Sequence, residues 1–308
     1  MAQYLVTGGA GFIGGHLARR LCRDGHEVRI LDDFSTGKRG NLDGLENSVE
    51  IIEANILDRD AVRSAMQGVE VCLHQAALPS VPRSVADPWT SNRVNVEGTL
   101  NVFLAARDAG VRRVVYASSS SVYGDADSYP VHEQMPRCPL SPYAVSKATT
   151  ELYAESFARL YGQDFVGLRY FNVFGPRQDP DSPYAAVIPR FITAMRQGQR
   201  PVIFGDGHQA RDFTAVENVV SANLKAAEAP GTIAGVYNIA CGKPITLLQL
   251  VDALNAALGS SIEPELAPPR DGDIKLSWAG IELARRAFGY EPGVSFEAGL
   301  VETVASLQ

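Results

Sequence analysis

The sequence contains little that would suggest a secreted, membrane or metal-binding protein. Its four cysteines form no CxxC pair and show no metal-ligand spacing with the five histidines, so we expect free thiols in a reducing cytosol and no metal site. No apolar stretch approaches the roughly twenty residues of a transmembrane helix. The first residues have neither a basic segment nor a cleavable apolar stretch. These absences predict a cytoplasmic protein without membrane contact.

An excess of basic residues is also missing. Lys and Arg number 28 against 35 Asp and Glu, which gives a formal net charge of −7. Such a chain lacks the overall basic surface that holds nucleic acid or anionic lipid. We therefore expect no nucleic-acid partner, and any phosphate group should be bound at a local site.

The composition is that of a folded globular protein, with 45% hydrophobic and 20% charged residues. Short β-branched runs alternate with helical patterns, which indicates a parallel sheet with helices on both faces. The expected strands are 3–7, 28–32, 49–53, 69–74, 111–117 and 165–170. The expected helices are 12–23, 58–67, 94–109 and 142–161. The predicted fold class is α/β, a Rossmann-type doubly wound parallel sheet with a smaller, mostly C-terminal lobe.

The character of the sequence changes after residue 170, where prolines become frequent. We expect 1–172 to form the Rossmann domain and 173–308 to form a substrate-binding lobe. Residues from about 213 to 240 are regular enough to return to the sheet domain.

Three glycines, Gly8, Gly11 and Gly14, follow the first expected strand with the spacing GxxGxxG and open directly into a helix. Glycines allow a tight turn and close approach of the backbone, so the helix N-terminus can hold a pyrophosphate. A glycine cluster alone is weak evidence. The second expected strand adds Asp32 and Asp33, whose carboxylates can accept hydrogen bonds from the adenosine ribose.

A carboxylate at this position should repel a 2′-phosphate, which favours NAD over NADP. Lys38 and Arg39 follow closely and leave NADP open as an alternative.

Tyr143 and Lys147 lie four residues apart, so a helix would place them on one face. A free tyrosine titrates near 10, and we expect the adjacent ammonium to lower the pKa of Tyr143 until the phenolate can act as a base. A serine run, 118–121, directly follows an expected strand, at the sheet edge where parallel sheets bind ligands. The order of glycine turn, strand-end acid, serine run and YxxxK is far more specific than any one of these features.

With these motifs the chain resembles the extended short-chain dehydrogenases, and specifically the UDP-sugar 4-epimerases. Further segments carry the likeness: 31–37, 74–77, 95–99, 168–176, 211–213 and 270–273. The resemblance implies that Ser119 binds the reacting hydroxyl, that Tyr143 is the base and that Lys147 holds the nicotinamide ribose, with Ser120 beside them.

The resemblance also implies two sets of binding residues. The NAD-binding set is Gly8, Gly11, Phe12, Ile13, Gly14, Asp32, Asp33, Asn55, Ile56, Gln75, Ala76, Ala77, Asn95, Tyr143, Lys147 and Tyr170. The substrate-binding set, in a nucleotide-sugar-binding lobe and its approaches, is Ser80, Ser119, Tyr143, Asn172, Ala186, Val187, Phe204, Arg211, Arg270, Asp273 and Ser277.

The implied reaction is 4-epimerisation of a UDP-sugar through a transient 4-keto intermediate. Alternatives on the same fold are UDP-glucuronate 4-epimerases, nucleotide-sugar decarboxylases and 4,6-dehydratases. Dehydratases carry acidic residues in the serine-run loop, where this chain has Ser120 and Ser121. A non-catalytic NAD-binding regulator is disfavoured because Tyr143 and Lys147 are both retained.

Substrate size is predicted from Ser277, which the resemblance places in the wall of the sugar pocket. A tyrosine there narrows the pocket, whereas serine leaves room for a 2-acetamido group, so we expect UDP-GlcNAc and UDP-GalNAc to be accepted as well as UDP-Glc and UDP-Gal. The alternative is that Ser277 is simply a small loop residue.

The chain departs from many relatives at Asn55, where they have aspartate, and in segment 277–280. Relatives commonly pair through helices like 94–109 and 142–161, which implies a homodimer.

Overall fold

The main sheet has seven strands in the order β11-β6-β5-β4-β1-β2-β3. The computed structural model describes residues 2–180, 186–269 and 275–307. The strands are β1 (Gln3–Thr7), β2 (Glu27–Asp32), β3 (Val49–Glu53), β4 (Val71–His74), β5 (Arg113–Ser119), β6 (Asp164–Tyr170) and β11 (Gly235–Ile239). All neighbours pair in parallel. The predicted α/β class with a Rossmann-type sheet is confirmed.

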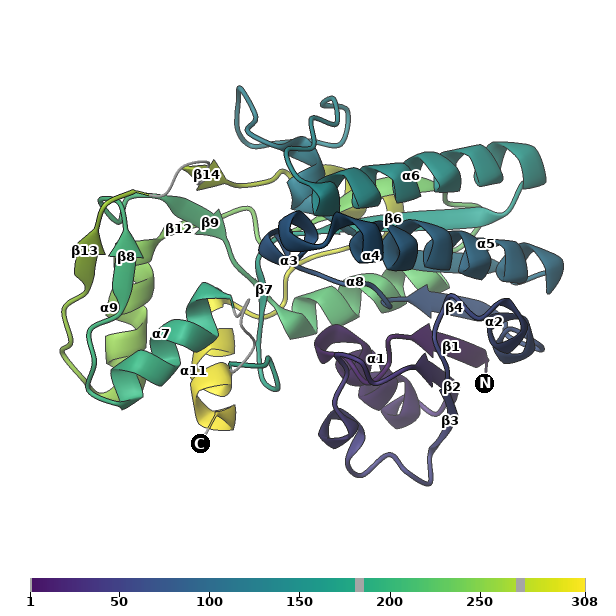
Figure 1. Cartoon of the computed structure of the whole chain (residues 1–308), viewed down its shortest axis with the longest axis horizontal. Coiled ribbons are helices and arrows are strands. Elements are labelled where there is room, and N and C mark those ends of the chain that lie inside the picture. The colour runs from purple at the N-terminus through teal and green to yellow at the C-terminus, as the bar shows by residue number, and fades with distance from the viewer. Residues whose placement is uncertain (1, 181–185, 270–274, 308) are drawn as a thin grey trace.

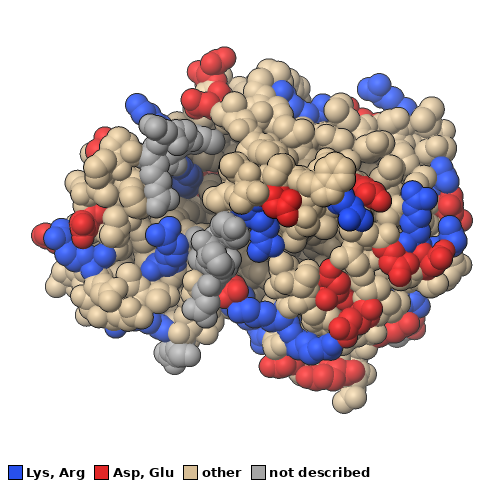
Figure 2. Space-filling view, in the orientation of Figure 1, with Lys and Arg blue, Asp and Glu red and all other residues tan. Residues whose placement is uncertain are grey.

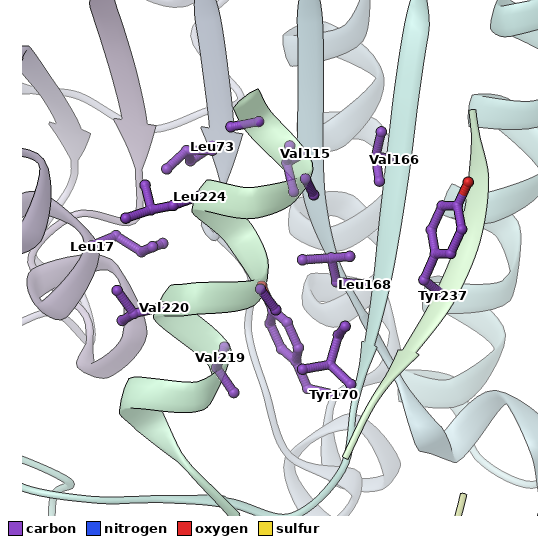
Figure 3. Close-up of a cluster of buried hydrophobic side chains, with 14 of the residues drawn as sticks. Leu17, Leu73, Val115, Val166, Leu168, Tyr170, Val219, Val220, Leu224 and Tyr237 are labelled. Atoms are coloured by element: carbon purple, nitrogen blue, oxygen red, sulfur yellow. The ribbon is translucent and has the colours of Figure 1, made fainter. Parts of the chain in front are cut away.

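Helices cover both faces of this sheet (Figure 1). One face carries α1 (Phe12–Arg23) and α8 (Val216–Glu228), and the other carries α2 (Arg59–Ala65), α5 (Thr99–Asp108) and α6 (Pro142–Tyr161). Successive residues of a strand point to opposite faces. In β1, Tyr4 and Val6 therefore join the core under α1 and α8, whereas Leu5 joins the core under the other three helices. Figure 3 shows the α8 side of this arrangement, with Leu224 and Val220 of α8 beside Leu17 of α1.

The end of α8 is fastened to the sheet by one buried arginine. Arg113 of β5 is ion-paired with Asp164 of β6 at 2.7 Å, and both side chains are nearly inaccessible. Its guanidinium also donates to the carbonyls of Ala226, Ala229 and Gly231. Arg113 thus joins β5 and β6 to the segment that leads from α8 to β11.

The helix expected over 94–109 is longer and less regular than the sequence suggests. It begins as α4 (Pro88–Asn92), capped by the Asp87 side chain, and continues through the π-helical turn η2 (Arg93–Gly98) into α5. Before it lies α3 (Val81–Ala86), and the remaining short turns are η1 (Arg39–Leu42) and η3 (Ser120–Tyr123). Within η2, a Cβ on Gly98 would lie 2.6 Å from Ile56 Cδ1, so glycine lets this part of the helix pack closely on the loop after β3.

The second part of the molecule has its own core beside the carboxyl end of the sheet (Figure 1). Its helices are α7 (Val187–Arg196), α9 (Leu247–Leu258) and α11 (Phe296–Ser306). Its strands form three small sheets: β7 (Val173–Phe174) with β10 (Thr214–Ala215), β9 (Ala210–Asp212) between β12 (Pro244–Thr246) and β14 (Leu276–Ser277), and β8 (Val202–Phe204) with β13 (Glu265–Ala267). Helix α10 (Glu282–Phe288) instead packs on β11, where Phe288 meets Tyr237. We propose that residues 1–172, together with about 213–240, form the Rossmann domain and that the rest of 173–308 forms the lobe. Helix α10 is a second segment of the C-terminal part that packs on the Rossmann domain.

Within the described ranges, no helix is both long and apolar enough to cross a membrane. Among those same residues, no group of three or more potential ligands is arranged to hold a metal ion. On the face shown in Figure 2, basic and acidic side chains are interspersed.

Candidate active site

The glycine turn between β1 and α1 leaves the helix N-terminus open to an anion. Gly8 has φ +68°, and a Cβ on it would lie 2.6 Å from the Ala76 nitrogen. A Cβ on Gly14 would lie 2.1 Å from the Gly8 oxygen, so side chains at either position would fill the turn. The N-cap residue Gly11 provides no capping side chain, and the first turn contains no acid. The free N–H groups of α1, from Phe12 and Ile13 onward, fit the pyrophosphate of a dinucleotide.

At the end of β2, Asp32 is tied to the glycine turn. Its two carboxylate oxygens accept hydrogen bonds from the Ala10 and Phe34 backbone nitrogens, each at 2.9 Å. Burial raises the pKa of Asp32, although these two bonds oppose the effect. Asp32 thus holds the loop in shape. It also lies at the expected position of the adenosine ribose, where its remaining lone pairs can accept hydrogen bonds from hydroxyl groups.

Asp33 and Asn55, which the sequence suggests separately, are brought together by the structure. Asn55 donates to Asp33 at 2.5 Å and accepts from the Leu57 backbone nitrogen. The Asn55 amide can therefore donate to the Asp33 carboxylate. An aspartate at position 55 could do so only if it were protonated. Ile56 is buried against Gly98 and lies in the core.

Two further predicted NAD-binding residues, Gln75 and Tyr170, meet at Asn223 of α8. Tyr170 donates to Gln75 Oε1 at 3.1 Å, and Gln75 donates to Asn223 Oδ1 at 3.1 Å. Asn223, fully buried, was not found from the sequence, because no local pattern marks a polar residue on an amphipathic helix as a site residue. Its burial beside two predicted residues is visible only in the fold.

Buried polar groups also fix the segment 74–78 that carries Ala76 and Ala77. His74 Nε2 lies 3.0 Å from Thr99 Oγ1, whose hydroxyl donates to the Asn95 carbonyl, so His74 must donate there and accept from Thr7 at 2.6 Å. Burial, with a smaller contribution from the Lys147 cation, lowers the pKa of His74 to about 3, which agrees with a neutral ring. The Ala76 nitrogen donates to Thr7 Oγ1 at 3.3 Å.

Asn95, predicted to bind NAD, uses its side chain inside the protein. It accepts from the Leu78 nitrogen at 2.7 Å and donates to Ser146 at 3.1 Å. It therefore connects η2 to α6, the helix that carries Tyr143 and Lys147.

The structure brings Ser119, Tyr143 and Lys147 together. Helix α6 begins beside Ser119 with the cap residue Ser141, and the Tyr143 nitrogen donates to Ser84 Oγ of α3 at 3.0 Å. The Ser119 hydroxyl lies close enough to the Tyr143 phenol to lower its pKa. Lys147 Nζ lies 6.0 Å from the centre of the Tyr143 ring and donates to the Ala117 carbonyl at 2.8 Å.

The serine run divides between two sides of β5. Ser121 donates to Ser119 Oγ at 2.9 Å, which leaves the Ser119 hydroxyl proton for the tyrosine. Ser120 lies beside them at the cavity wall. Ser118 points the other way and donates to Glu151 at 2.6 Å.

We expected Lys147 to lower the pKa of Tyr143, and this expectation is wrong: the protein raises that pKa. Burial raises the pKa of Tyr143, and the Ser119 hydroxyl opposes that rise. The Lys147 ammonium instead donates its hydrogen bond to the Ala117 carbonyl. Burial lowers the pKa of Lys147 itself to about 8, while the charge of Glu151 raises it.

A cavity of about 300 Å³ opens beside the serine run. Four of its lining residues were predicted from the sequence: Ser120, Asn172, Arg211 and Ser277. Tyr129, Leu140 and Trp278 also line it and were missed. The signal for them is nonlocal, since a single bridge between Val131 and Ala279 brings the two segments together.

Other predicted substrate residues lie apart from this wall or outside the described chain. Ser80 caps α3 with φ 129° and adjoins the lining residue Val81. Of the residues described, Ala186 and Val187 at the start of α7 and Phe204 at the end of β8 do not line the cavity. Arg270 and Asp273 lie outside the described residues.

Comparison with known proteins agrees with this geometry. The model of the NAD dependent epimerase/dehydratase family matches residues 4–240. The chain belongs to this family.

Relatives of this epimerase/dehydratase chain include a UDP-glucose 4-epimerase of Mycolicibacterium smegmatis, 42% identical over 97% of this chain and 96% of the relative. A UDP-N-acetylglucosamine 4-epimerase from Methanobrevibacter ruminantium, solved with UDP-N-acetylmuramic acid, is 42% identical, with TM-score 0.95 over 99% of this chain and 98% of that one. A UDP-glucose 4-epimerase of Thermus thermophilus solved with NAD is 36% identical, with TM-score 0.88 over 99% and 98% of the two chains.

The family places the chain among the extended short-chain dehydrogenases of the UDP-sugar epimerase type, with NAD as its cofactor. The residues fit that cofactor, because the glycine turn would be filled by any side chain at Gly8 or Gly14 and α1 begins without a cap of its own.

We predict that the Lys147 ammonium titrates near pH 8, below the 10.5 of an ordinary lysine. Between these values the folded protein has lost a proton that the unfolded chain still holds. The free energy of unfolding should therefore rise with pH in this window, relative to Lys147→Met. NMR of labelled lysine side chains, with Lys147→Met to assign the signal, measures the midpoint. A midpoint near that of ordinary lysine would contradict the prediction.

Proposed function

We propose that the protein is an NAD-dependent UDP-sugar 4-epimerase that accepts UDP-GlcNAc and UDP-GalNAc as well as UDP-Glc and UDP-Gal. The observation that carries the proposal is that Ser119 interacts with Tyr143, with Lys147 one helical turn beyond the tyrosine. This pair adjoins a cavity whose wall contains Ser120 and Ser121.

In the proposed reaction, Tyr143 takes the proton of the sugar 4-hydroxyl while Ser119 holds the same oxygen. NAD, held by the glycine turn and the N-terminus of α1, would supply the hydride chemistry at C4, and the resulting 4-keto sugar would be reduced on its opposite face. To take the hydroxyl proton, Tyr143 must start as the phenolate, a form that burial disfavours and that the Ser119 hydroxyl favours. Ser121, by donating to Ser119, orients the serine hydroxyl toward Tyr143. Proton and hydride both return, so the reaction has no net redox change.

The nucleotide half of the substrate would be held by groups at the far side of the cavity. Asn172 has φ 34° and donates to the Asp212 carbonyl, which fixes it beside Arg211 of β9. A guanidinium in this position suits a diphosphate. Binding energy from this remote half keeps the keto sugar in the site while it turns over.

The alternatives on the same fold are less well supported. Dehydration requires an acid and a base near C5 and C6 of the sugar. The corresponding positions are the hydroxyl groups of Ser120 and Ser121, whose side chains lie at the cavity. Hydroxyl groups of this kind titrate far too high to replace a carboxylic acid.

Acceptance of N-acetylated sugars is supported by Ser277, which lies in the cavity wall beside Trp278. A small residue there leaves space that a phenol ring would fill. The Methanobrevibacter relative is a UDP-N-acetylglucosamine 4-epimerase, which supports this proposal.

The test is the product profile on UDP-GlcNAc, UDP-Glc and UDP-glucuronate, with NAD content measured alongside. We expect the 4-epimers of the first two without loss of CO2 or water.

Ser277→Tyr should lower kcat/KM for UDP-GlcNAc by about 10-fold or more, since an overfilled pocket costs about 1–3 kcal/mol. Its effect on UDP-Glc should be small, which controls for misfolding. Equal losses on both substrates would contradict the role of Ser277, and release of CO2 or water would contradict epimerisation.

We also propose a homodimer paired through α5 and α6. Helix α6 exposes Val145, Leu152 and Leu160, which lie seven and eight residues apart and so form one apolar stripe. Light scattering should give the mass of two chains, and Leu152→Glu should give that of one. Leu266→Glu, on the exposed strand β13, is the matched control and should leave the dimer intact. A wild-type protein with the mass of one chain would rule out this pairing.

A further inference from the structure

Two basic residues, Lys38 and Arg39, are held beside the adenosine end of the dinucleotide site. The Lys38 nitrogen donates to the Ala10 carbonyl of the glycine turn at 3.0 Å. Gly37 packs so closely on Asp32 that a Cβ there would lie 2.8 Å from the carboxylate. The loop therefore presents its cations next to the strand end where a ribose 2′ position is expected. Lysine or arginine at such a place is what a 2′-phosphate requires.

Arg39 is occupied by an acid of the neighbouring strand. The register of β2 and β3 pairs Asp32 with Glu53, so Glu53 also stands at the carboxyl edge of the sheet. Arg39 is ion-paired with Glu53 and lies over the Phe34 ring at 4.1 Å. The ring and the carboxylate together hold the guanidinium in place.

Lys38 is occupied by an acid from a distant part of the chain. Its ammonium lies 2.9 Å from Asp179, in the segment that follows β7. The same segment is attached to the loop a second time, because Arg177 donates to the Gly40 carbonyl at 2.9 Å. The segment thus brings a carboxylate across to the nucleotide-binding domain.

We infer that Glu53 and Asp179 are cofactor-specificity residues that neutralise Arg39 and Lys38 and thereby exclude the 2′-phosphate of NADP. With them, three cations, Lys38, Arg39 and Arg177, face four carboxylates: Asp32, Asp33, Glu53 and Asp179. Without them, three cations face two carboxylates. Acidic residues at the end of β2 are thus reinforced by acids from β3 and from the substrate lobe. This inference concerns cofactor choice and goes beyond the proposed epimerase activity.

Both ion pairs are exposed to solvent, so each is weak alone and is screened by salt. The effect of removing the acids should therefore be modest, additive and greatest at low ionic strength. A mainly steric exclusion of the phosphate would not depend on salt in this way.

The experiment measures binding by competition, as the amount of NADP+ that displaces labelled NAD+ from the protein at equilibrium. It compares wild type, Glu53→Gln, and Glu53→Gln with Asp179→Asn. The control is Glu50→Gln with Asp60→Asn, which removes two exposed carboxylates paired with Arg29 and Arg63, away from the loop. Thermal unfolding verifies that every variant is folded.

We expect the ratio of NADP+ to NAD+ affinity to rise about 3-fold for the single variant and on the order of 10-fold for the double variant at low salt. High salt, or Arg39→Ala added to Glu53→Gln, should abolish the gain of that variant. An unchanged ratio, or an equal rise in the control, would overturn the inference. Because binding rather than turnover is measured, failure of the proposed epimerisation would leave this result unaffected and would be seen separately in the product profile.

Discussion

The catalytic geometry depends on one buried carboxylate, that of Glu151. It has no exposed surface and lies one helical turn beyond Lys147 on α6. It accepts from Arg169 of β6 at 2.7 and 2.8 Å and from Ser118 of β5 at 2.6 Å. Arg137 adds a further bond at 2.6 Å. Two strands and a loop are thus fastened to the helix that carries the tyrosine and lysine.

A buried charge of this kind is tolerated only when its partners are complete, because an unpaired ion inside a protein costs several kcal/mol. The bonds from Arg169 and Ser118 therefore fix how α6 lies on the sheet. Once α6 is fixed, Lys147 reaches the Ala117 carbonyl and Tyr143 reaches Ser119. From the other end, Ser84 holds the Tyr143 backbone. The reacting groups are placed before any substrate arrives, which is the preorganisation that makes polar groups effective in catalysis.

Much of the Rossmann domain was predictable because its signals are local. The strand and helix bounds from β1 to β6 follow short apolar runs and helical periodicity, and the glycine turn and YxxxK depend on spacing alone. The π-helical turn η2 was not predictable, since no local pattern in 93–98 marks it. Similarly, α10 returns to β11 through contacts that no nearby pattern records.

For the site, the sequence identified which residues meet but not what their surroundings do to them. Helical spacing places Lys147 beside Tyr143, yet it gives neither the direction of the ammonium nor the burial that raises the pKa of Tyr143. It likewise treats Asn55 as a departure, whereas the structure pairs it with Asp33. Tyr129 and Trp278 reach the cavity through the bridge between Val131 and Ala279, a contact between distant segments.

The central claim is that Tyr143 moves the proton while the hydride leaves and returns within one site. It is tested most directly with a UDP-sugar that carries deuterium at C4, incubated with wild type and with Tyr143→Phe. We predict that the wild-type product retains the deuterium, and that the variant keeps its NAD but is slower by about 100-fold or more. Loss of the deuterium to solvent, or a near-normal rate for Tyr143→Phe, would contradict the claim.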